Sequence, residues 1–213
     1  MITKNSIQVL VVGLATALLP VLMLLINCPS VSADTPALDP NWTWVEKPWG
    51  RPVIDRGAKG EWDNYAVDNP YVYIENGRFY CFFEAQDKPF QNNGHERFSV
   101  AVSDDGLHWR KTGKPLLDVG KGERWDNVVA KLPAGVLKKD GKYYLFYSGS
   151  NNRTKQIGLA TSTSLTGGWS KSAHNPVIPS RPGHWDSWIS TYPSPVFKIG
   201  GRYFLLYRGM KRR

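Results

Sequence analysis

Cysteine is scarce in this chain, with two residues among 213, Cys28 and Cys81. Cys28 lies in an apolar N-terminal segment that we expect to be removed. Cys81 would then stand alone in the exported protein, and no disulfide framework is available. Because Cys81 sits in the apolar run 79–83, a buried small side chain is favoured over a nucleophile there. Stability must therefore come from packing.

Several motifs of known chemistry are also missing. The sequence has no glycine-rich phosphate loop, no His/Cys cluster with zinc spacing and no Gly-x-Ser-x-Gly elbow. No metal or organic cofactor is implied. The formal net charge is +9, but the basic residues are scattered and only 211–213 form a run. We therefore expect a solvated basic surface and no nucleic-acid partner.

Residues 1–33 have the features of a secretory signal. Lys4 gives a positive start, residues 7–26 are mostly apolar, and Val-Ser-Ala at 31–33 offers a small-residue cleavage site. Cleavage after Ala33 predicts a secreted or periplasmic protein without membrane attachment. Two alternatives stay open: an uncleaved apolar stretch of about 20 residues is long enough to span a bilayer, and Cys28 loosely resembles the cysteine of a lipoprotein anchor.

An internal repeat dominates the remaining sequence. A Trp-Asp pair recurs at intervals of 63 and 60 residues, and a proline stands eight positions after each tryptophan. Self-similarity at such a period is typical of repeat architectures. The pairs are Trp62-Asp63, Trp125-Asp126 and Trp185-Asp186, and the prolines are Pro70, Pro133 and Pro193.

Each proline is followed by a short apolar strand, a tight turn and an aromatic strand. The turns at 76–77, 140–141 and 200–201 are Asn-Gly, Asp-Gly and Gly-Gly, which favour two-residue hairpins. A third strand and an outer Pro-apolar strand follow in the first two units. The predicted strands are 71–74, 79–83, 98–103 and 115–116, then 135–137, 143–147, 156–162 and 176–177, and finally 196–197 and 203–207.

Four short strands per unit, with no sustained helical periodicity after residue 34, predict an all-β fold: a β-propeller of four-stranded blades. A sandwich or jelly roll is the alternative fold, but neither requires the Trp-Asp pair, the proline and the glycine turn to recur in one register. The predicted propeller domain covers 34–213, with blades at approximately 60–120, 121–180 and 181–213. Because a closed ring needs at least four blades, we expect an incomplete propeller, about two and a half blades of a probable five, and a monomer if full length.

The repeat resembles that of the five-bladed β-propeller glycosidases, the group that includes glycoside hydrolase families 43, 32 and 117. The resemblance extends over about residues 44–210. It implies that the first strand of each blade lines a central funnel, where one protonated and one ionised carboxyl group act on a glycosidic bond. The stretches that carry it are VDNPYVYIENGRFYCFFEAQ, KLPAGVLKKDGKYYLFYSGS, IGLATSTSLTGGWSK and YPSPVFKIGGRYFLLYRG.

The resemblance assigns Asp68, two residues before Pro70, as catalytic base or nucleophile. At the equivalent positions of the next two units stand Lys131 and Thr191, where several relatives carry further acids. This departure leaves the second catalytic carboxylate open.

The remaining catalytic candidates within the sequence are Asp126 and Asp186, or else an acid on further blades. A structural alternative is that the aspartate recurring in every unit, with Asp63, is a turn or capping residue shared by the architecture. Substrate binding is predicted for polar and aromatic residues near the expected funnel. These residues are Trp62, Asp63, Glu84, His95, Lys131, Trp185, Tyr192 and Arg208.

Within the predicted binding set, His95 lies in a charged loop and can act as a proton donor. Lys131 and Arg208 can bind a substrate carboxylate. The resulting hypothesis is a secreted glycoside hydrolase, or its N-terminal fragment, acting on plant or algal poly- or oligosaccharides. The alternatives are a non-catalytic sugar-binding propeller and a protein-interaction propeller. A second carboxylate within about 5 to 10 Å of Asp68 would favour the enzyme.

Overall fold

The computed structural model describes residues 9–10, 52–191 and 196–211. Strands and turns make up these ranges, which contain one short 3-10 turn, η1 (Phe90–Asn92), and no α-helix. None of the described elements is a helix that could cross a membrane. The predicted all-β class is confirmed. The expected signal segment lies outside the described residues except for β1 (Val9–Leu10), which pairs in parallel with β12 (Arg202–Phe204).

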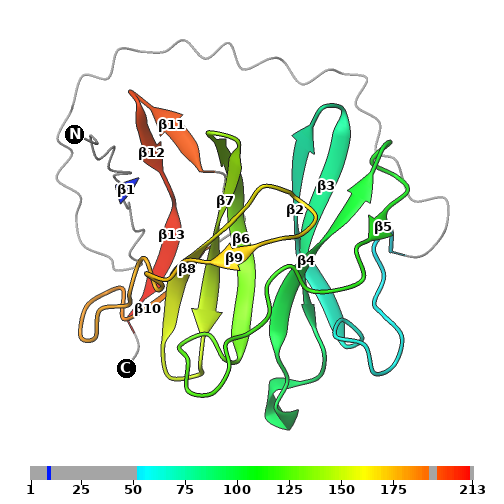
Figure 1. Ribbon diagram of the computed structural model, residues 1–213. Coiled ribbons are helices and arrows are strands. Elements are labelled where there is room, and N and C mark those ends of the chain that lie inside the picture. The colour runs from blue at the N-terminus through cyan, green and yellow to red at the C-terminus, as the bar shows by residue number, and fades with distance from the viewer. Residues whose placement is uncertain (1–8, 11–51, 192–195, 212–213) are drawn as a thin grey trace, which may run out of the picture. The chain divides into compact units, whose positions relative to one another are not determined.

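Two four-stranded antiparallel blades follow each other along the chain (Figure 1). A single parallel bridge, Glu96 to Val129, joins the third strand of the first blade to the first strand of the second. The blades are β2 (Ala66–Glu75), β3 (Arg78–Gln86), β4 (Glu96–Ser103) and β5 (Arg110–Lys111), then β6 (Val129–Lys139), β7 (Lys142–Ser150), β8 (Lys155–Ser162) and β9 (Ser170–Lys171).

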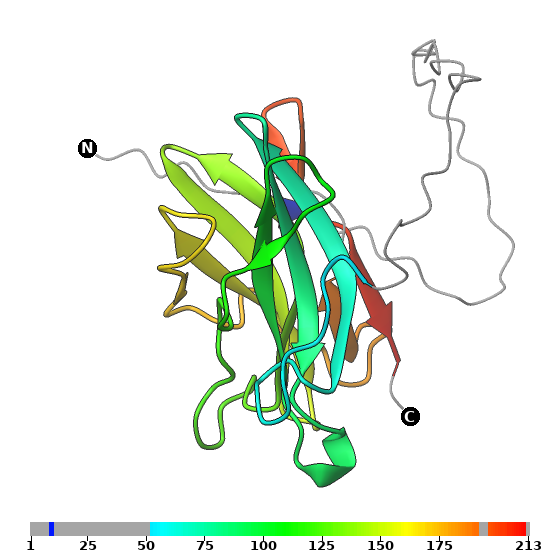
Figure 2. The ribbon, with the colours of Figure 1, turned by 90° about the vertical axis from the view of Figure 1, so that its right-hand side faces the viewer.

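The third unit begins another blade. β10 (Trp188–Thr191) pairs with β13 (Tyr207–Met210), and β11 (Phe197–Ile199) pairs with β12. Figure 2 shows the blades from the side, with the loop that carries η1 extending past the ends of β3 and β4. The predicted propeller architecture of four-stranded blades is therefore present in the described part of the chain.

The hairpin turns form as predicted. Asn76 and Gly77 both have positive φ, 51° and 75°, as a tight turn matched to the twist of its strands requires. Asp140 and Gly141 repeat this geometry at 49° and 73°. Asparagine, aspartate and glycine tolerate this region of backbone space, so the local sequence fixes the turn and with it the register of each hairpin.

The fourth strands lie earlier than predicted. β5 directly follows Trp109 and β9 directly follows Trp169. Just after the predicted Pro-apolar segments there are only single bridges, Leu117 to Phe98 and Ile178 to Ile157. Proline has no N–H to donate to a ladder, so regular pairing ends before Pro115. The outer edge of each blade is consequently short.

Tryptophans of the repeat pack against their own blades. Each tryptophan stacks on an aromatic ring of β3, β7 or β13, with ring centroids 5.8 to 6.2 Å apart. The pairs are Trp62–Phe83, Trp125–Tyr147 and Trp185–Tyr207. Between the first two blades, Glu75 accepts hydrogen bonds from Lys138 at 2.7 Å and from the Tyr143 hydroxyl at 2.6 Å. These contacts hold neighbouring blades in a fixed relation.

Candidate functional site

Three carboxyl groups of the first blade converge. One oxygen from each of Asp68, Glu84 and Glu96 lies within 4.8 Å of the others. Residues directly opposite in an antiparallel ladder point to the same face, and so do residues two apart on a strand. Because Asp68 pairs with Glu84 and Gln86 pairs with Glu96, the ladder places all three acids on one face.

A lysine from the second blade completes this cluster. The Lys131 Nζ lies 2.7 Å from Glu96 and 3.5 Å from Glu84. Directly after Asp68 the strand has an irregular register, and Asn69 adopts a left-handed conformation with φ 47°. The Asn69 amide then donates a hydrogen bond of 3.1 Å to Glu84. The cluster therefore depends on contact between two blades and on a local break in β2.

Protonation differs between the carboxyl groups. Glu84 is fully buried, and its Oε1 has no hydrogen-bond partner among the described residues. Burial raises the pKa of Glu84 to about 8, aided by the negative charges of Glu96 and Asp68 and opposed by Lys131. Burial therefore favours the protonated form of Glu84. Asp68 is more exposed than Glu84. Its pKa is nevertheless raised, first by partial burial of the carboxyl group and then by the negative charge of Glu96.

Lys131 remains charged in this environment. Burial alone would lower the pKa of Lys131, but attraction to Glu84 and Glu96 outweighs it and raises the pKa. Next to it, the Ser148 hydroxyl accepts a hydrogen bond from the Thr191 backbone N–H at 2.8 Å. Thr191, the third residue of the equivalent set, is thus a contact between the second and third units.

Glu96 and Lys155 are site residues that the sequence prediction did not assign. Burial and the nearby charges of Lys131 and Arg208 lower the pKa of Lys155 to about 8, against the attraction of Glu96 and Glu84. Lys155 lies opposite Ser150 at the start of β8, just as Glu96 lies opposite Gln86 at the start of β4. The sequence did contain a signal for these two residues, because a charged residue stands at the start of the third strand in both blades.

The aspartates that follow the tryptophans do not join this cluster. Each is about 2% exposed and forms an ion pair with a basic residue outside the carboxyl cluster. The pairs are Asp63–Lys111 at 2.6 Å, Asp126–Lys171 at 2.6 Å and Asp186–Arg181 at 2.7 Å. Tyrosine hydroxyls also donate to Asp126 and Asp186. We therefore reassign Asp126 and Asp186 from catalysis to the architecture, the structural alternative raised by the repeat.

The predicted binding residues divide in a similar way. Trp62 and Trp185 are engaged in stacking within their blades, and Asp63 in its ion pair. His95 contacts Asp87, with 3.4 Å between the ring Nδ1 and the carboxylate. Glu84 and Lys131 lie in the cluster, and Arg208 lies within electrostatic range of Lys155. Tyr192 lies outside the described residues.

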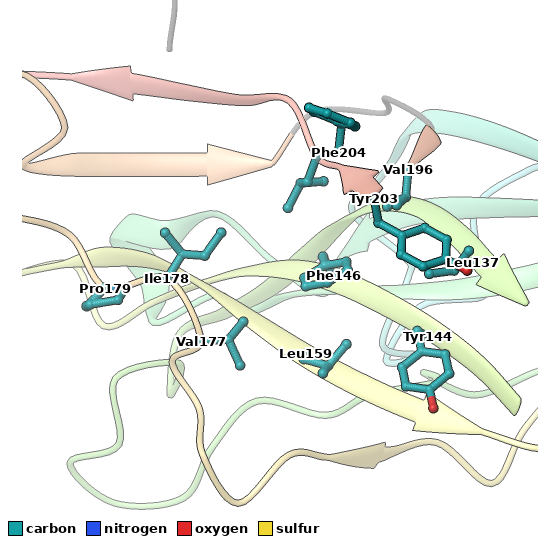
Figure 3. Close-up of a pocket in the computed structure, with 11 residues that line it drawn as sticks. Leu137, Tyr144, Phe146, Leu159, Val177, Ile178, Pro179, Val196, Tyr203 and Phe204 are labelled. Carbon is teal, nitrogen blue, oxygen red and sulfur yellow. The ribbon is translucent and has the colours of Figure 1, made fainter. Parts of the chain in front are cut away.

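An apolar cavity of about 460 Å³ lies elsewhere, between the second blade and the β11–β12 hairpin. Figure 3 shows Phe146, Leu159, Val177 and Phe204 around it. Its lining contains no carboxyl group, unlike the Asp68 cluster.

The whole repeat region matches one protein family. The model of glycosyl hydrolases family 43 matches residues 37–211. The chain belongs to this family. The predicted resemblance to propeller glycosidases is confirmed by this match and by structural similarity to a family 117 glycoside hydrolase of Zobellia galactanivorans, with a TM-score of 0.54 and 25% identity over 62% of this chain and 38% of that one.

Curated relatives of this family 43 chain are longer. It is 30% identical over 164 residues to a 1,2-beta-oligomannan phosphorylase of Thermoanaerobacter sp., covering 74% of this chain and 51% of the relative. It is 29% identical over 112 residues to a beta-1,2-mannobiose phosphorylase of the same organism, covering 48% and 36%. The chain thus spans about half or less of each of these two relatives. A putative glycosidase of Bacteroides thetaiotaomicron shares the fold, with a TM-score of 0.56 at 18% identity over 77% of this chain and 59% of that one.

Proposed function

We propose that this chain is a secreted glycoside hydrolase, or a piece of one, that cleaves glycosidic bonds in poly- or oligosaccharides by paired-carboxyl chemistry. Membership of family 43 supports a carbohydrate substrate. The signal-like features of residues 1–33 support export. Plant or algal glycans remain the substrate source that we propose from the sequence resemblance.

One observation carries this proposal: a second carboxyl group lies within 4.8 Å of Asp68. Hydrolytic mechanisms on sugars use two such groups, about 5 to 5.5 Å apart when configuration is retained and about 6.5 to 9.5 Å apart when it is inverted. A propeller that only binds sugars has no need of acids held this close together.

The pair shares its protons unequally. Two carboxyl groups at this separation do not both ionise readily. Burial favours the proton on Glu84, whose pKa is raised to about 8, so the more exposed Asp68 is the proposed ionised member of the pair. Asp68 is accordingly the proposed base or nucleophile that contacts the sugar. Glu84 is a positioning residue that holds the proton of the pair, with Lys131 and Asn69 fixing its carboxyl group.

Replacing Asp68 with asparagine tests the assignment. Asp68→Asn keeps the shape but cannot accept a proton or form a glycosyl ester, so kcat should fall by about 10² to 10⁴ while KM changes little. The assay is reducing-sugar release from a panel of oligosaccharides by the full chain. Asp104→Asn, at a side chain 80% exposed, is the matched control and should retain activity. Unchanged turnover in Asp68→Asn would remove Asp68 from catalysis.

Phosphorolysis is a second candidate, favoured by the names of the two Thermoanaerobacter relatives. It would use inorganic phosphate in place of water as the acceptor of the glycosyl group. A dependence of turnover on added phosphate, with release of a sugar 1-phosphate, would select this reaction. Tight binding of oligosaccharides with no cleavage under either condition would select the non-catalytic propeller.

A further inference from the structure

Opposite the acids of the first blade, the second blade presents lysines at the same repeat positions. Lys131 stands at the position of Asp68, and Lys155 at the position of Glu96. Lys131 pairs with Ser148, and Lys155 pairs with Ser150 two residues along β7, so both lysines share one face of this blade. The site thus has an acidic wall from one blade and a basic wall from the next.

Lys155 differs from three other partly buried lysines of these blades. Lys111, Lys131 and Lys171 each lie 2.6 to 2.7 Å from a carboxylate. Within the part of the chain that the structure describes, Lys155 is half-buried and forms no ion pair or side-chain hydrogen bond. An ammonium group removed from water without a partner is unfavourable. An anion at this position would relieve that cost.

The surrounding charges do not supply that anion. Glu96 is already bonded to Lys131 at 2.7 Å, and the attraction of Glu96 and Glu84 does not offset the burial of Lys155, whose pKa is still lowered to about 8. Lys131 and Arg208 add further positive charge around Lys155, and this repulsion contributes to its lowered pKa. A negative group held near Lys155 would therefore interact with several cations at once.

We propose that Lys155, flanked by Lys131 and Arg208, forms a subsite for an anionic substituent carried by the sugar, a carboxylate or a sulfate. This inference rests on the proposed function and names its substrate class: acidic glycosides rather than neutral ones. The basic wall would hold the anion and turn the sugar so that its reacting end meets Asp68 on the acidic wall.

Matched ligands test the subsite without catalysis. Calorimetric binding to the Asp68→Asn chain would compare methyl β-glucuronide with methyl β-glucoside, and galactose 6-sulfate with galactose. We expect at least one anionic member to bind about tenfold or more tightly than its neutral partner, and we expect salt to weaken this preference. The preference should also fall as pH rises through about 8, where Lys155 loses its proton. Because turnover is not measured, a failure of hydrolysis leaves this test intact.

Two substitutions at Lys155 give the decisive comparison. Lys155→Met, which keeps the length of the apolar stem, should abolish the preference for the anionic ligand, whereas Lys155→Arg should retain most of it. An unchanged thermal midpoint would show that each variant is folded. Equal affinity for both members of both ligand pairs in the Asp68→Asn chain with Lys155 intact would overturn the proposal. A second result would also overturn the proposal: inorganic phosphate binds, Lys155→Met abolishes this binding, and cleavage depends on phosphate. The basic wall would then bind a free co-substrate instead of a substituent of the sugar.

Discussion

Substituting Glu84 with glutamine should change how stability depends on pH. A carboxyl group whose pKa is raised in the folded state binds a proton that the unfolded chain has released. Between the ordinary value of 4.5 and the folded value of about 8, the folded state therefore holds more protons. The stabilising contribution of Glu84 is complete below pH 4.5 and is lost as pH rises towards 8.

The size of this effect follows from the same two values. Each pH unit within the window costs up to about 1.4 kcal/mol for one proton. Over the roughly 2.5 units from 4.5 to neutrality, the penalty reaches about 3 kcal/mol. Glutamine has the same shape, is always neutral and can still accept the Asn69 hydrogen bond. Glu84→Gln should therefore match wild type near pH 4.5 and exceed its stability at pH 7 by up to about 3 kcal/mol.

Urea unfolding at pH 4.5, 6, 7 and 8 would measure this difference. Glu75→Gln is the matched control, because attraction and hydrogen bonding from Lys138 and Tyr143 lower the pKa of Glu75. Its contribution is complete above the ordinary value of 4.5 and is lost only below it, so between pH 4.5 and 8 the curve of Glu75→Gln should run nearly parallel to that of wild type. Parallel curves for wild type and Glu84→Gln would refute the reasoning, since they would mean that Lys131 holds Glu84 ionised throughout as a buried ion pair.

Two further substitutions address the architecture. Lys171→Met leaves the buried Asp126 without its cation, and urea unfolding should show a loss of about 3 kcal/mol; an unchanged midpoint would mean that Asp126 gains nothing from the pair. Tyr143→Phe removes the inter-blade hydrogen bond to Glu75 and should cost about 1 kcal/mol. Unchanged stability of Tyr143→Phe would show that this contact does not couple the blades.

The sequence predicted those parts of the fold that depend on local chemistry. Asn76-Gly77 and Asp140-Gly141 require a tight turn wherever they stand between β-rich segments, and the structure has both turns. The outer strands were misplaced because an apolar pair such as 115–116 has strand propensity, but its proline interrupts the ladder. The apolar pattern of the sequence predicts that a strand is present, but it does not define the residues at which the strand begins and ends.

The candidate site was predicted only in part, because its chemistry arises between elements. Asp68 was assigned from its place in the repeat, and it does lie beside other carboxyl groups. The raised pKa of Glu84 depends on complete burial and on Glu96 from a neighbouring strand. Lys131 reaches the acids only because the second blade packs against the first. No spacing within one blade contains this information.

Repetition itself separates structural residues from candidate functional ones. In each described unit a tryptophan stacks on the sheet and an aspartate pairs with a cation, from the fourth strand in the first two units and from Arg181 in the third. Each blade of a propeller contacts a different side of a substrate that is bound near the axis. The residues that contact the substrate therefore need not be the same in every blade. Equivalent positions that change from acid to base, such as Asp68 to Lys131 and Glu96 to Lys155, are therefore where chemistry is to be sought. By that criterion Asp126 and Asp186 match Asp63 and belong to the repeated architecture, whereas Lys131 departs from the acidic pattern at the position of Asp68.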